Sequence, residues 1–316
     1  MTGVGILNNL DVKFVEISDL KEIWEGLLKL TKNPSPFISY GWFFALGKCL
    51  LEKNVKSMVF YRNDEPVGIL PAEIKDKTLF LIGDERVTDL NGIILNCRYS
   101  KEIVEFIADF IMENDLQVEL YPLDSEGVLM KFLPGMLKVK KAEKAESFSV
   151  LELPSSREEY LGSLSSKKRH EIRRKLKKVK SSTIKKLEAG EINLLFKLME
   201  SSSAEKKNFL SKEVKDFFRE IALYLEGIGA LRLRACFYKS KILAVLFCFQ
   251  MKDTVYAFNT GYNPEFYKLS PGVVAFALDI EEAINEGFTC YNFLRGEERF
   301  KSDLGARRVH TWKIKR

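Results

Sequence analysis

Hydrophobic and polar positions follow the same order in two stretches of the chain. Residues 56–83 and 232–261 each contain three apolar runs separated by short polar turns, and each stretch ends in a glycine. Apolar runs joined by tight turns predict antiparallel strands, because a short turn reverses the chain. A helical pattern follows each stretch, over Ser100–Glu113 and over Gly272–Gly287, and a short apolar strand follows each helix. A β-β-β-loop-α-β unit is therefore predicted to occur twice.

The last strand of each unit returns through a helix, so it is expected to lie parallel to the third strand. These connections predict an α+β fold with two mixed sheets of antiparallel strands flanked by helices. The chain is expected to divide within the charged stretch Lys140–Ser156, which gives domains of residues 1–150 and 151–316. Further helical patterns cover Ser18–Thr31, Ser39–Lys53, Ile192–Lys207 and Lys212–Gly227, and the two returning strands cover Leu116–Tyr121 and Phe288–Leu294.

The composition argues against several classes of chemistry. Hydrophobic residues make up 46% of the chain and charged residues 30%, the balance of a soluble globular protein. Only two histidines, His170 and His310, are present, which argues against a histidine-rich metal site and against a Ser-His-Asp mechanism. The five scattered cysteines include no CxxC pair, as expected for reduced core thiols. No secretory signal or membrane-spanning run is visible, so a cytoplasmic protein is predicted.

The positive charge of the chain is concentrated in one predicted helix. Lys167–Lys180 contains nine Lys/Arg residues and one Glu, a net charge of +8, whereas the whole chain carries +6. Ile172, Leu176 and Val179 recur at helical spacing, so one narrow apolar stripe faces the protein and the remaining surface is cationic. Such a helix is typical of surfaces that bind nucleic-acid phosphates, membranes or anionic substrates, and a merely solvated face is the alternative.

A candidate anion site follows the second repeat. A strand ends at Asn259-Thr260-Gly261, and Ser270-Pro271-Gly272 opens a long apolar helix. Ser270 suits the N-cap, Pro271 suits the first helical position, and Gly272 lets a ligand approach the backbone. Unpaired N–H groups and the helix dipole would then suit a phosphate or pyrophosphate. An ordinary capped helix is the alternative interpretation.

A second candidate site lies between Tyr291 and Arg307. A buried strand runs into a glycine and then into a dense set of ionisable residues: Arg295, Glu297, Glu298, Arg299, Lys301, Asp303 and Arg307. Strand ends of this kind commonly carry acid–base groups. The alternative is a solvated loop with weak surface ion pairs.

Several motifs resemble one family when they are taken together. The chain resembles GNAT-superfamily acyltransferases of the cellulose-biosynthesis acetyltransferase type, which are related to the Fem aminoacyl transferases. The resemblance covers nearly the whole chain and implies two tandem GNAT-like domains. The motifs are Ser165-x-Lys167-x-Arg169-x-x-x-Arg173-Arg174, then Asn263-Pro264 with Tyr267-x-x-Ser270-Pro271-Gly272, and Tyr291-Asn292-Phe293 with Gly296-Glu297-x-x-Phe300-Lys301, together with Trp24, Pro36-Phe37 and Glu65–Pro71 near the N-terminus.

The resemblance implies that acetyl-CoA or another acyl-CoA is the co-substrate, without a metal. Its pyrophosphate is expected at the backbone amides of Leu269 to Val273, with Ser270, Pro271 and Gly272 between them. The strand edge Thr254–Thr260 is expected to pair with the pantetheine arm, and Asn259 and Gly261 are candidate cofactor-binding residues. The first repeat lacks the Ser-Pro-Gly sequence and carries two acids after Gly83, so it is expected to be a degenerate domain.

The resemblance also implies direct transfer of an acyl group, expected to be acetyl, to an amine in a ternary complex. Glu297 is the candidate base, directly or through a water, and Lys301 is the candidate charge-stabilising residue. Tyr291 is a candidate proton donor to the leaving thiolate, and Tyr256 or Tyr267 could serve equally. The family's usual Asp is Asn292 in this chain, and a frequent Tyr is Phe300. Three arginines, Arg169, Arg173 and Arg295, are the candidates for binding an anionic acceptor such as a sugar nucleotide or another small molecule.

Two other functions compete with this prediction. A Fem-like transferase that uses aminoacyl-tRNA would fit the basic helix, although the chain is too short there for a coiled-coil arm. A non-catalytic GNAT scaffold that binds an anionic partner is the other alternative. The sequence does not identify the acceptor or the oligomeric state.

Overall fold

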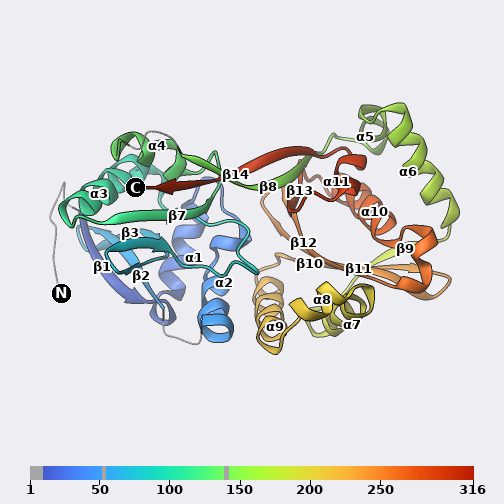
Figure 1. Ribbon diagram of the computed structural model, residues 1–316, viewed down its shortest axis with the longest axis horizontal. Helices are drawn as coiled ribbons and strands as arrows, with labels where there is room; N and C mark the ends of the chain where they lie inside the picture. The colour runs from blue at the N-terminus through green and yellow to red at the C-terminus, as the bar shows by residue number, and fades with distance from the viewer. Residues whose placement is uncertain (1–9, 52–54, 139–141) are drawn as a thin grey trace. The chain divides into compact units, whose positions relative to one another are not determined.

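The structure is a computed structural model that describes residues 10–51, 55–138 and 142–316 (Figure 1). The chain forms two compact units, one of residues 1–146 and 310–316 and the other of residues 147–309. The boundary falls inside two strands, β8 (Glu143–Glu152) and β14 (Arg307–Lys315), so the chain crosses between the units twice. The end of the predicted helix Ser39–Lys53 and the start of the predicted break Lys140–Ser156 lie outside the described residues.

The first unit differs from a simple repeat because its second apolar run divides at Pro71. β3 (Glu65–Leu70) belongs to a sheet of order β1-β2-β3-β6, whereas β4 (Ala72–Lys75) belongs to a set of order β4-β5-β7-β14. Proline has no N–H for a strand ladder, which suits a residue where the chain changes sheet. The other strands and helices are β1 (Leu10–Glu16), α1 (Lys21–Leu30), α2 (Tyr40–Ala45), β2 (Lys56–Arg62), β5 (Thr78–Leu81), β6 (Ile94–Leu95), α3 (Ser100–Glu113), β7 (Gln117–Leu123) and α4 (Val128–Met136).

The second unit keeps the predicted order of strands. Its strands lie in the order β8-β13-β12-β11-β10-β9, and β10, β11 and β12 form an antiparallel meander. Its elements are α5 (Arg157–Ser163), α6 (Ser166–Lys178), β9 (Thr183–Lys186), α7 (Asn193–Ser202), α8 (Ala204–Phe209), α9 (Lys212–Gly227), β10 (Leu231–Tyr238), β11 (Lys241–Met251), β12 (Thr254–Tyr262), the 3-10 segment η6 (Pro264–Leu269), α10 (Pro271–Asn285), β13 (Cys290–Arg295) and α11 (Arg299–Asp303).

The predicted parallel return of the fourth strand is confirmed in both units. β5 pairs in parallel with β7, and β12 pairs in parallel with β13. The α+β fold with mixed sheets flanked by helices is therefore confirmed.

The predicted helix Ile192–Lys207 is interrupted in the structure. Ser203 has an extended backbone that ends α7, and its hydroxyl accepts a hydrogen bond from the Lys206 amide at 3.2 Å. A serine at this position caps a new helix, α8, and changes the direction of the chain. The break matters because it places the side chain of Lys206 near the end of β12.

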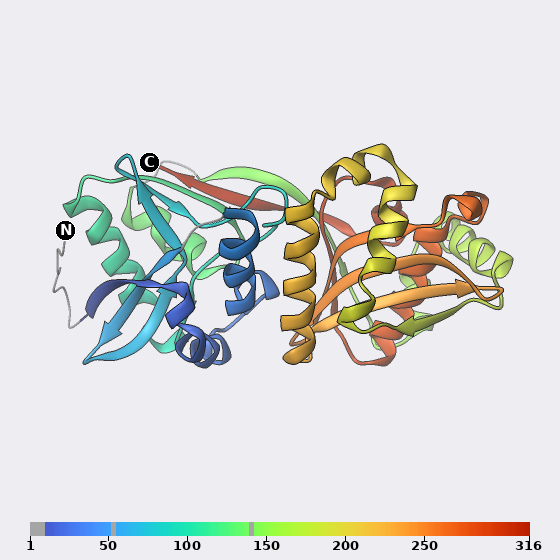
Figure 2. The same ribbon diagram turned by 90° about the horizontal axis from the view of Figure 1, so that it is seen from below.

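Helices cover both faces of the second unit's sheet. Helix α10 lies on one face, and α7, α8 and α9 lie on the other (Figures 1 and 2). On the α10 side, buried aliphatic residues such as Val274 and Ile280 pack with Leu246 and Val255 of the strands. On the opposite side, Phe218 of α9 contacts an aromatic cluster of β11 and β12. Helices thus cover both faces of the sheet, which leaves the ends of its strands for the candidate functional residues.

Candidate functional site

Strands β12 and β13 diverge after a short parallel pairing. The paired residues are Thr254–Tyr256 of β12 and Cys290–Asn292 of β13. Beyond them β12 stays paired with β11 as far as Tyr262, and β13 stays paired with β8 as far as Arg295. Within the described residues, the edges of β12 and β13 that face each other therefore have no strand partner beyond Tyr256 and Asn292. We call this region the strand divergence.

A β-bulge at Phe258 lies beside the strand divergence. Ala257 is opposite Cys248 and Asn259 is opposite Phe247, so Phe258 is the extra residue. A bulge bends its strand and increases the local twist, and it therefore helps to turn β12 away from β13.

Thr260 presents its backbone carbonyl to the strand divergence. The Asn263 amide donates to the Leu243 carbonyl at 2.8 Å, which identifies these opposite residues as a hydrogen-bonded pair. Such pairs alternate along an antiparallel ladder. The backbone of Gly261 is therefore used by β11, whereas that of Thr260 points away from β11. Asn259 lies two positions before Gly261 in the same ladder, so its backbone also faces β11. The residue is half-buried.

Gly261 has a packing role in the structure. A Cβ on Gly261 would lie 2.7 Å from the Met199 amide nitrogen and 2.9 Å from the Leu195 carbonyl oxygen. The missing side chain thus lets the backbone of α7 lie directly on β12. This position cannot also admit a ligand from the same face.

The segment from Leu269 to Val273 forms the predicted turn into α10. Ser270 has a left-handed backbone (φ 54°), and its hydroxyl makes no capping hydrogen bond to the helix. Its carbonyl accepts from the Val274 amide, whereas no acceptor is recorded within the described residues for the amides of Gly272 and Val273. Pro271 occupies the first helical position as predicted. Ser270 thus occupies the predicted N-cap position without a capping hydrogen bond from its side chain, and the two free amides remain available to an anion.

Gly272 leaves open space at this helix start. A Cβ on Gly272 would meet no atom within 4 Å. Leu269 and Val273 are half-buried and pack on the hydrophobic core beside it. The turn is therefore held by apolar contacts while its amides stay accessible.

The basic helix α6 contacts α10. After α6 the chain enters β9, where Thr183 pairs with Phe237 of β10. The β10–β11 hairpin that follows Phe237 reaches η6 through an ion pair between Lys241 and Glu265 at 3.6 Å. Ile172 is the buried residue of α6, which agrees with the predicted apolar stripe.

The two candidate arginines of α6 differ in their surroundings. Arg169 points to the end of α5, where it donates to the carbonyls of Leu161 and Gly162 at 3.4 and 3.5 Å. Arg173 is exposed and no partner is recorded for it among the described residues. Arg173 is thus the more available of the two for an anion.

The turn after β13 is organised around a buried lysine. The Lys301 ammonium group donates to the carbonyls of Arg295 and Gly296 at 2.5 and 3.3 Å and pairs with the Glu298 carboxylate at 2.9 Å. Lys301 is 4% exposed, whereas the Glu298 side chain is 57% exposed. Gly296 has φ 111°, and a Cβ there would collide with the Glu298 carboxylate. The turn therefore needs glycine at this position.

Glu297, the candidate base, lies on the outer side of this turn. Its side chain is 61% exposed and its carboxylate lies 3.5 Å from the Arg308 guanidinium group. The neighbouring Glu298 is the carboxylate that contacts Lys301. Sequence spacing placed both acids in one loop but did not indicate which of them pairs with the lysine.

Lys206 is a functional candidate that the sequence analysis missed. Its ammonium group donates to the Thr260 carbonyl at 2.6 Å, although the two residues are 54 positions apart. Burial lowers the pKa of Lys206 below its ordinary value, and the carboxylates of Glu298 and Glu205 offset only part of that shift. Glu298 of the β13 turn is therefore close enough to influence this lysine electrostatically.

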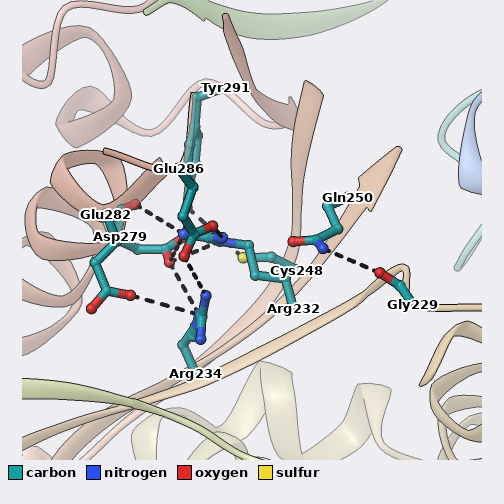
Figure 3. Close-up of polar contacts among 9 residues, drawn as sticks. All are labelled: Gly229, Arg232, Arg234, Cys248, Gln250, Asp279, Glu282, Glu286 and Tyr291. Carbon is teal, nitrogen blue, oxygen red and sulfur yellow. Dashed lines mark hydrogen bonds and ion pairs between the residues drawn. The ribbon is translucent and has the colours of Figure 1, made fainter. Parts of the chain in front are cut away.

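Tyr291, the candidate proton donor, belongs to a buried ionic cluster on the α10 side of the sheet (Figure 3). Its hydroxyl donates to the Asp279 carboxylate at 2.7 Å and lies 3.8 Å from the Cys248 sulfur. Tyr291 is fully buried, and burial together with the Asp279 charge raises its pKa well above the usual value. An enclosed and more weakly acidic hydroxyl is unsuited to give a proton to a leaving thiolate.

The same cluster joins α10 to β10. Asp279 accepts a hydrogen bond from the Arg232 guanidinium group at 3.0 Å, and both side chains are completely buried. Glu286 pairs with Arg232 and with Arg234, whose guanidinium group also lies 3.8 Å from Glu282 (Figure 3). Burial would lower the pKa of Arg232, but the carboxylates of Asp279 and Glu286 outweigh it and raise the pKa. The helix is thereby tied to the sheet by paired charges.

The described residues contain neither a metal-binding cluster nor a membrane-spanning helix. No group of three or more His, Cys, Asp or Glu side chains in the described ranges is arranged to hold a metal ion. No helix within residues 10–51, 55–138 and 142–316 is long and apolar enough to cross a membrane.

The chain matches one protein family over part of its length. Residues 166–302, from the start of α6 to α11, match the family described as acetyltransferase (GNAT) domain. No curated protein matched the sequence significantly. The matched range contains α6, the strand divergence, the start of α10 and the Lys301 turn.

Solved structures resemble nearly the whole chain. FemX has 11% sequence identity and a TM-score of 0.66, with 96% of each chain covered. L-PGS from Bacillus licheniformis has 12% identity and a TM-score of 0.60, with 93% of this chain and 91% of that chain covered. A tandem GNAT protein from the clavulanic acid biosynthesis pathway has 9% identity and a TM-score of 0.52, with coverage of 97% and 98%.

These similarities define the class of the protein at a coarse level. The fold is that of tandem GNAT proteins, and the C-terminal half contains a GNAT-type acetyltransferase domain match. Together they support an acyltransferase. Sequence identities between 9% and 12% support a shared fold, but they do not identify the donor, the acceptor or the pathway.

Proposed function

We propose that the protein is an acyl-CoA-dependent N-acyltransferase that transfers an acyl group, in the first instance acetyl, to an amine. The observation that carries this proposal is the start of α10, where two free backbone amides follow the diverging strand β12 after the short segment η6. A helix start of this kind suits the pyrophosphate of coenzyme A. A location in the cytoplasm is part of the same proposal.

The residues fit the donor at three points. The open space over Gly272 allows a phosphate to approach the helix start closely. The edge of β12 beyond Tyr256 faces no strand among the described residues and is open to the amide groups of an extended arm, in the manner of an added strand. Exposed Lys and Arg residues of α6 lie beside α10 and add a favourable field for a polyanion.

The reacting end of the donor would lie at the strand divergence, near the Lys301 turn. We assign Glu297 as the base that receives the amine proton, and Lys301 as the residue that fixes the turn carrying it. Arg173 and Arg295 remain the proposed contacts to an anionic acceptor. Arg169 already caps α5 and Tyr291 is enclosed, so neither is assigned a chemical role.

We assign acyl transfer to residues 151–316 and treat residues 1–150 as a degenerate GNAT-like domain. The division rests on the absence of a Ser-Pro-Gly helix start after Gly83. In the structure the acid that follows, Asp84, is paired with Arg86 at 2.7 Å. An anion site like that at α10 is thus proposed for the second unit alone.

Replacement of Gly272 tests the donor site. Gly272→Asp places a carboxylate where the amides should meet phosphate, and we expect it to abolish binding of CoA and acetyl-CoA in isothermal titration calorimetry. An acid near a helix N-terminus does not disfavour the helix, so the melting temperature should be preserved. The control is Gly190→Asp, which adds the same charge at another exposed and uncrowded glycine of the second unit. Unchanged affinity of the Gly272→Asp variant would remove the donor site from the start of α10.

Aminoacyl-tRNA is the alternative donor, because α6 is exposed and strongly basic and the fold resembles FemX. Total tRNA should then stabilise the protein in thermal melts, and the effect should fall steeply with salt. Stabilisation by acetyl-CoA and not by tRNA supports the proposal above. Stabilisation by neither ligand favours a non-catalytic scaffold.

A further inference from the structure

At the strand divergence, the Lys206 ammonium group has no hydrogen-bond partner on its own helix among the described residues. The lysine extends from α8, on the sheet face opposite α10, and its ammonium group reaches the Thr260 carbonyl of β12. The side chain is half-buried, so the charge is partly withdrawn from water. A lysine ammonium has three N–H donors, and the structure records one hydrogen bond for it within the described residues.

The carbonyl that Lys206 contacts faces the unpaired side of β12. The alternation of the β11–β12 ladder directs the Thr260 carbonyl toward the side on which β13 has turned away. The lysine is therefore held at the edge of the divergence by a backbone atom that no strand uses.

A second charged group reaches this region from β13. Glu298 belongs to the turn fixed by Lys301, and its carboxylate acts electrostatically on Lys206. The Glu298 charge favours the ammonium form of Lys206. The Lys206 ammonium group at β12 and the Glu298 carboxylate of the turn after β13 are thus close enough to interact electrostatically.

We infer that Lys206 is a further catalytic residue, whose ammonium group contacts the thioester carbonyl oxygen and stabilises the negative charge that develops there. This inference rests on the proposed acyl-CoA function. Two N–H donors remain for the oxygen while the third stays on Thr260, and a fixed, partly desolvated cation is effective at such a position.

The step is balanced without a further reactant. The amine lone pair forms the C–N bond, and the carbonyl π electrons move to oxygen beside Lys206. Their return breaks the C–S bond, and sulfur leaves with the electron pair. The amine proton passes to Glu297 and from there to the thiolate, so the products are an amide and a thiol. Lys206 stays protonated throughout.

Isotope-edited infrared spectroscopy of bound acetyl-CoA, labelled with ¹³C at the thioester carbonyl, tests the contact without any acceptor. In the wild-type protein we expect the carbonyl stretch to lie at lower frequency than in solution. In Lys206→Met and Lys206→Gln the frequency should return to the solution value. Cleavage of the bound thioester by hydroxylamine, a small amine probe, should slow by roughly a hundredfold in both variants.

Lys206→Gln separates charge from backbone support, because glutamine can still donate to the Thr260 carbonyl. The matched control is Lys207→Met, which removes an exposed lysine from the neighbouring position of α8. Melting temperatures and acetyl-CoA affinity should be the same in all four proteins.

The outcomes are distinguishable. Wild-type spectra and rates in Lys206→Gln would mean that Lys206 only supports Thr260 and would overturn the inference. The same result in Lys206→Met would overturn it as well. If the wild-type protein itself does not bind acetyl-CoA, the proposed function fails first and the inference falls with it.

Discussion

At the scale of single residues, the candidate site depends on groups whose surroundings leave little choice of side chain. Gly296 combines a positive φ of 111° with direct crowding by Glu298, and a Cβ there would also lie 3.0 Å from the Lys301 ammonium nitrogen. The glycine lets the turn close over the Glu298–Lys301 pair. Lys301 in turn satisfies two backbone carbonyls, so the pair and the glycine form one local unit.

Gly296→Ala should destabilise the protein by about 1–3 kcal/mol, because alanine adds backbone strain and displaces the ion pair. The matched control is Gly287→Ala, where φ is also positive (86°) but a Cβ would meet nothing within 4 Å. Urea unfolding followed by circular dichroism measures both variants. Equal losses would mean that backbone strain alone sets the cost and that the Glu298–Lys301 pair is not crowded.

At the scale of elements, α10 is positioned by its whole length and not by its start alone. Its first turn lacks a side-chain cap, yet Asp279 in its middle and Glu286 at its end are tied to Arg232 of β10. Burying such charges is costly, so the pair is weak evidence for stability. It does fix the helix against one particular strand.

Arg232→Met should destabilise the protein by roughly 3–5 kcal/mol, because it leaves the Asp279 carboxylate buried without its partner. The double variant Arg232→Met with Asp279→Leu should recover most of that loss. Chemical denaturation measures the free energy of unfolding of each variant. Arg219→Met, in the surface pair of Arg219 with Asp216, is the control and should cost about 1 kcal/mol or less. A loss in Arg232→Met no larger than in the control contradicts the assigned burial cost.

Local signals in the sequence were sufficient for several helices of both units. The helices Ser100–Glu113 and Lys212–Gly227 were predicted with the bounds that the structure has, and Pro271 was placed at the first helical position. Hydrophobic periodicity and the Ser-Pro-Gly sequence depend only on residues that are close together in the chain. These helices could be predicted because such local signals determine where they begin and end.

Contacts between distant segments could not be predicted from local sequence patterns. Nothing near Lys206 indicates that its side chain will meet Thr260, because that contact depends on the break at Ser203 and on the course of β12. The burial of Tyr291 was missed for the same reason, since its partner Asp279 lies on another element. Candidate residues could be found from motifs, but their accessibility and partners are properties of the packed fold.

At the scale of the whole molecule, the first unit is completed by residues from the other end of the described chain. Residues 310–316, which include most of β14, belong to that unit. They pair with β7, where Trp312 is opposite Leu123 and Val118 and Arg316 exchange backbone hydrogen bonds of 2.9 and 3.0 Å. The strand also buries Ile314 in the first unit's core.

Deletion of residues 310–316 should destabilise the first unit more than the second, because it removes a strand and exposes the edge of β7. Tryptophan fluorescence follows the first unit, which contains the buried Trp24 and Trp42, whereas residues 147–309 contain no tryptophan. Reaction of Cys236 follows the second unit, because burial raises the pKa of this thiol to about 12 and keeps it unreactive until it is exposed. An equal shift of both midpoints would contradict a contribution confined to the first unit.

The course of β14 also sets the order in which the nascent chain can fold. Domains commonly fold during translation, beginning with the one made first. Here the ribosome must finish the whole second unit before residues 310–316 emerge and take their place beside β7. The unit that is synthesised first therefore reaches its native state last. Until then the edge of β7 has no strand partner from β14 and is a surface that chaperones can bind.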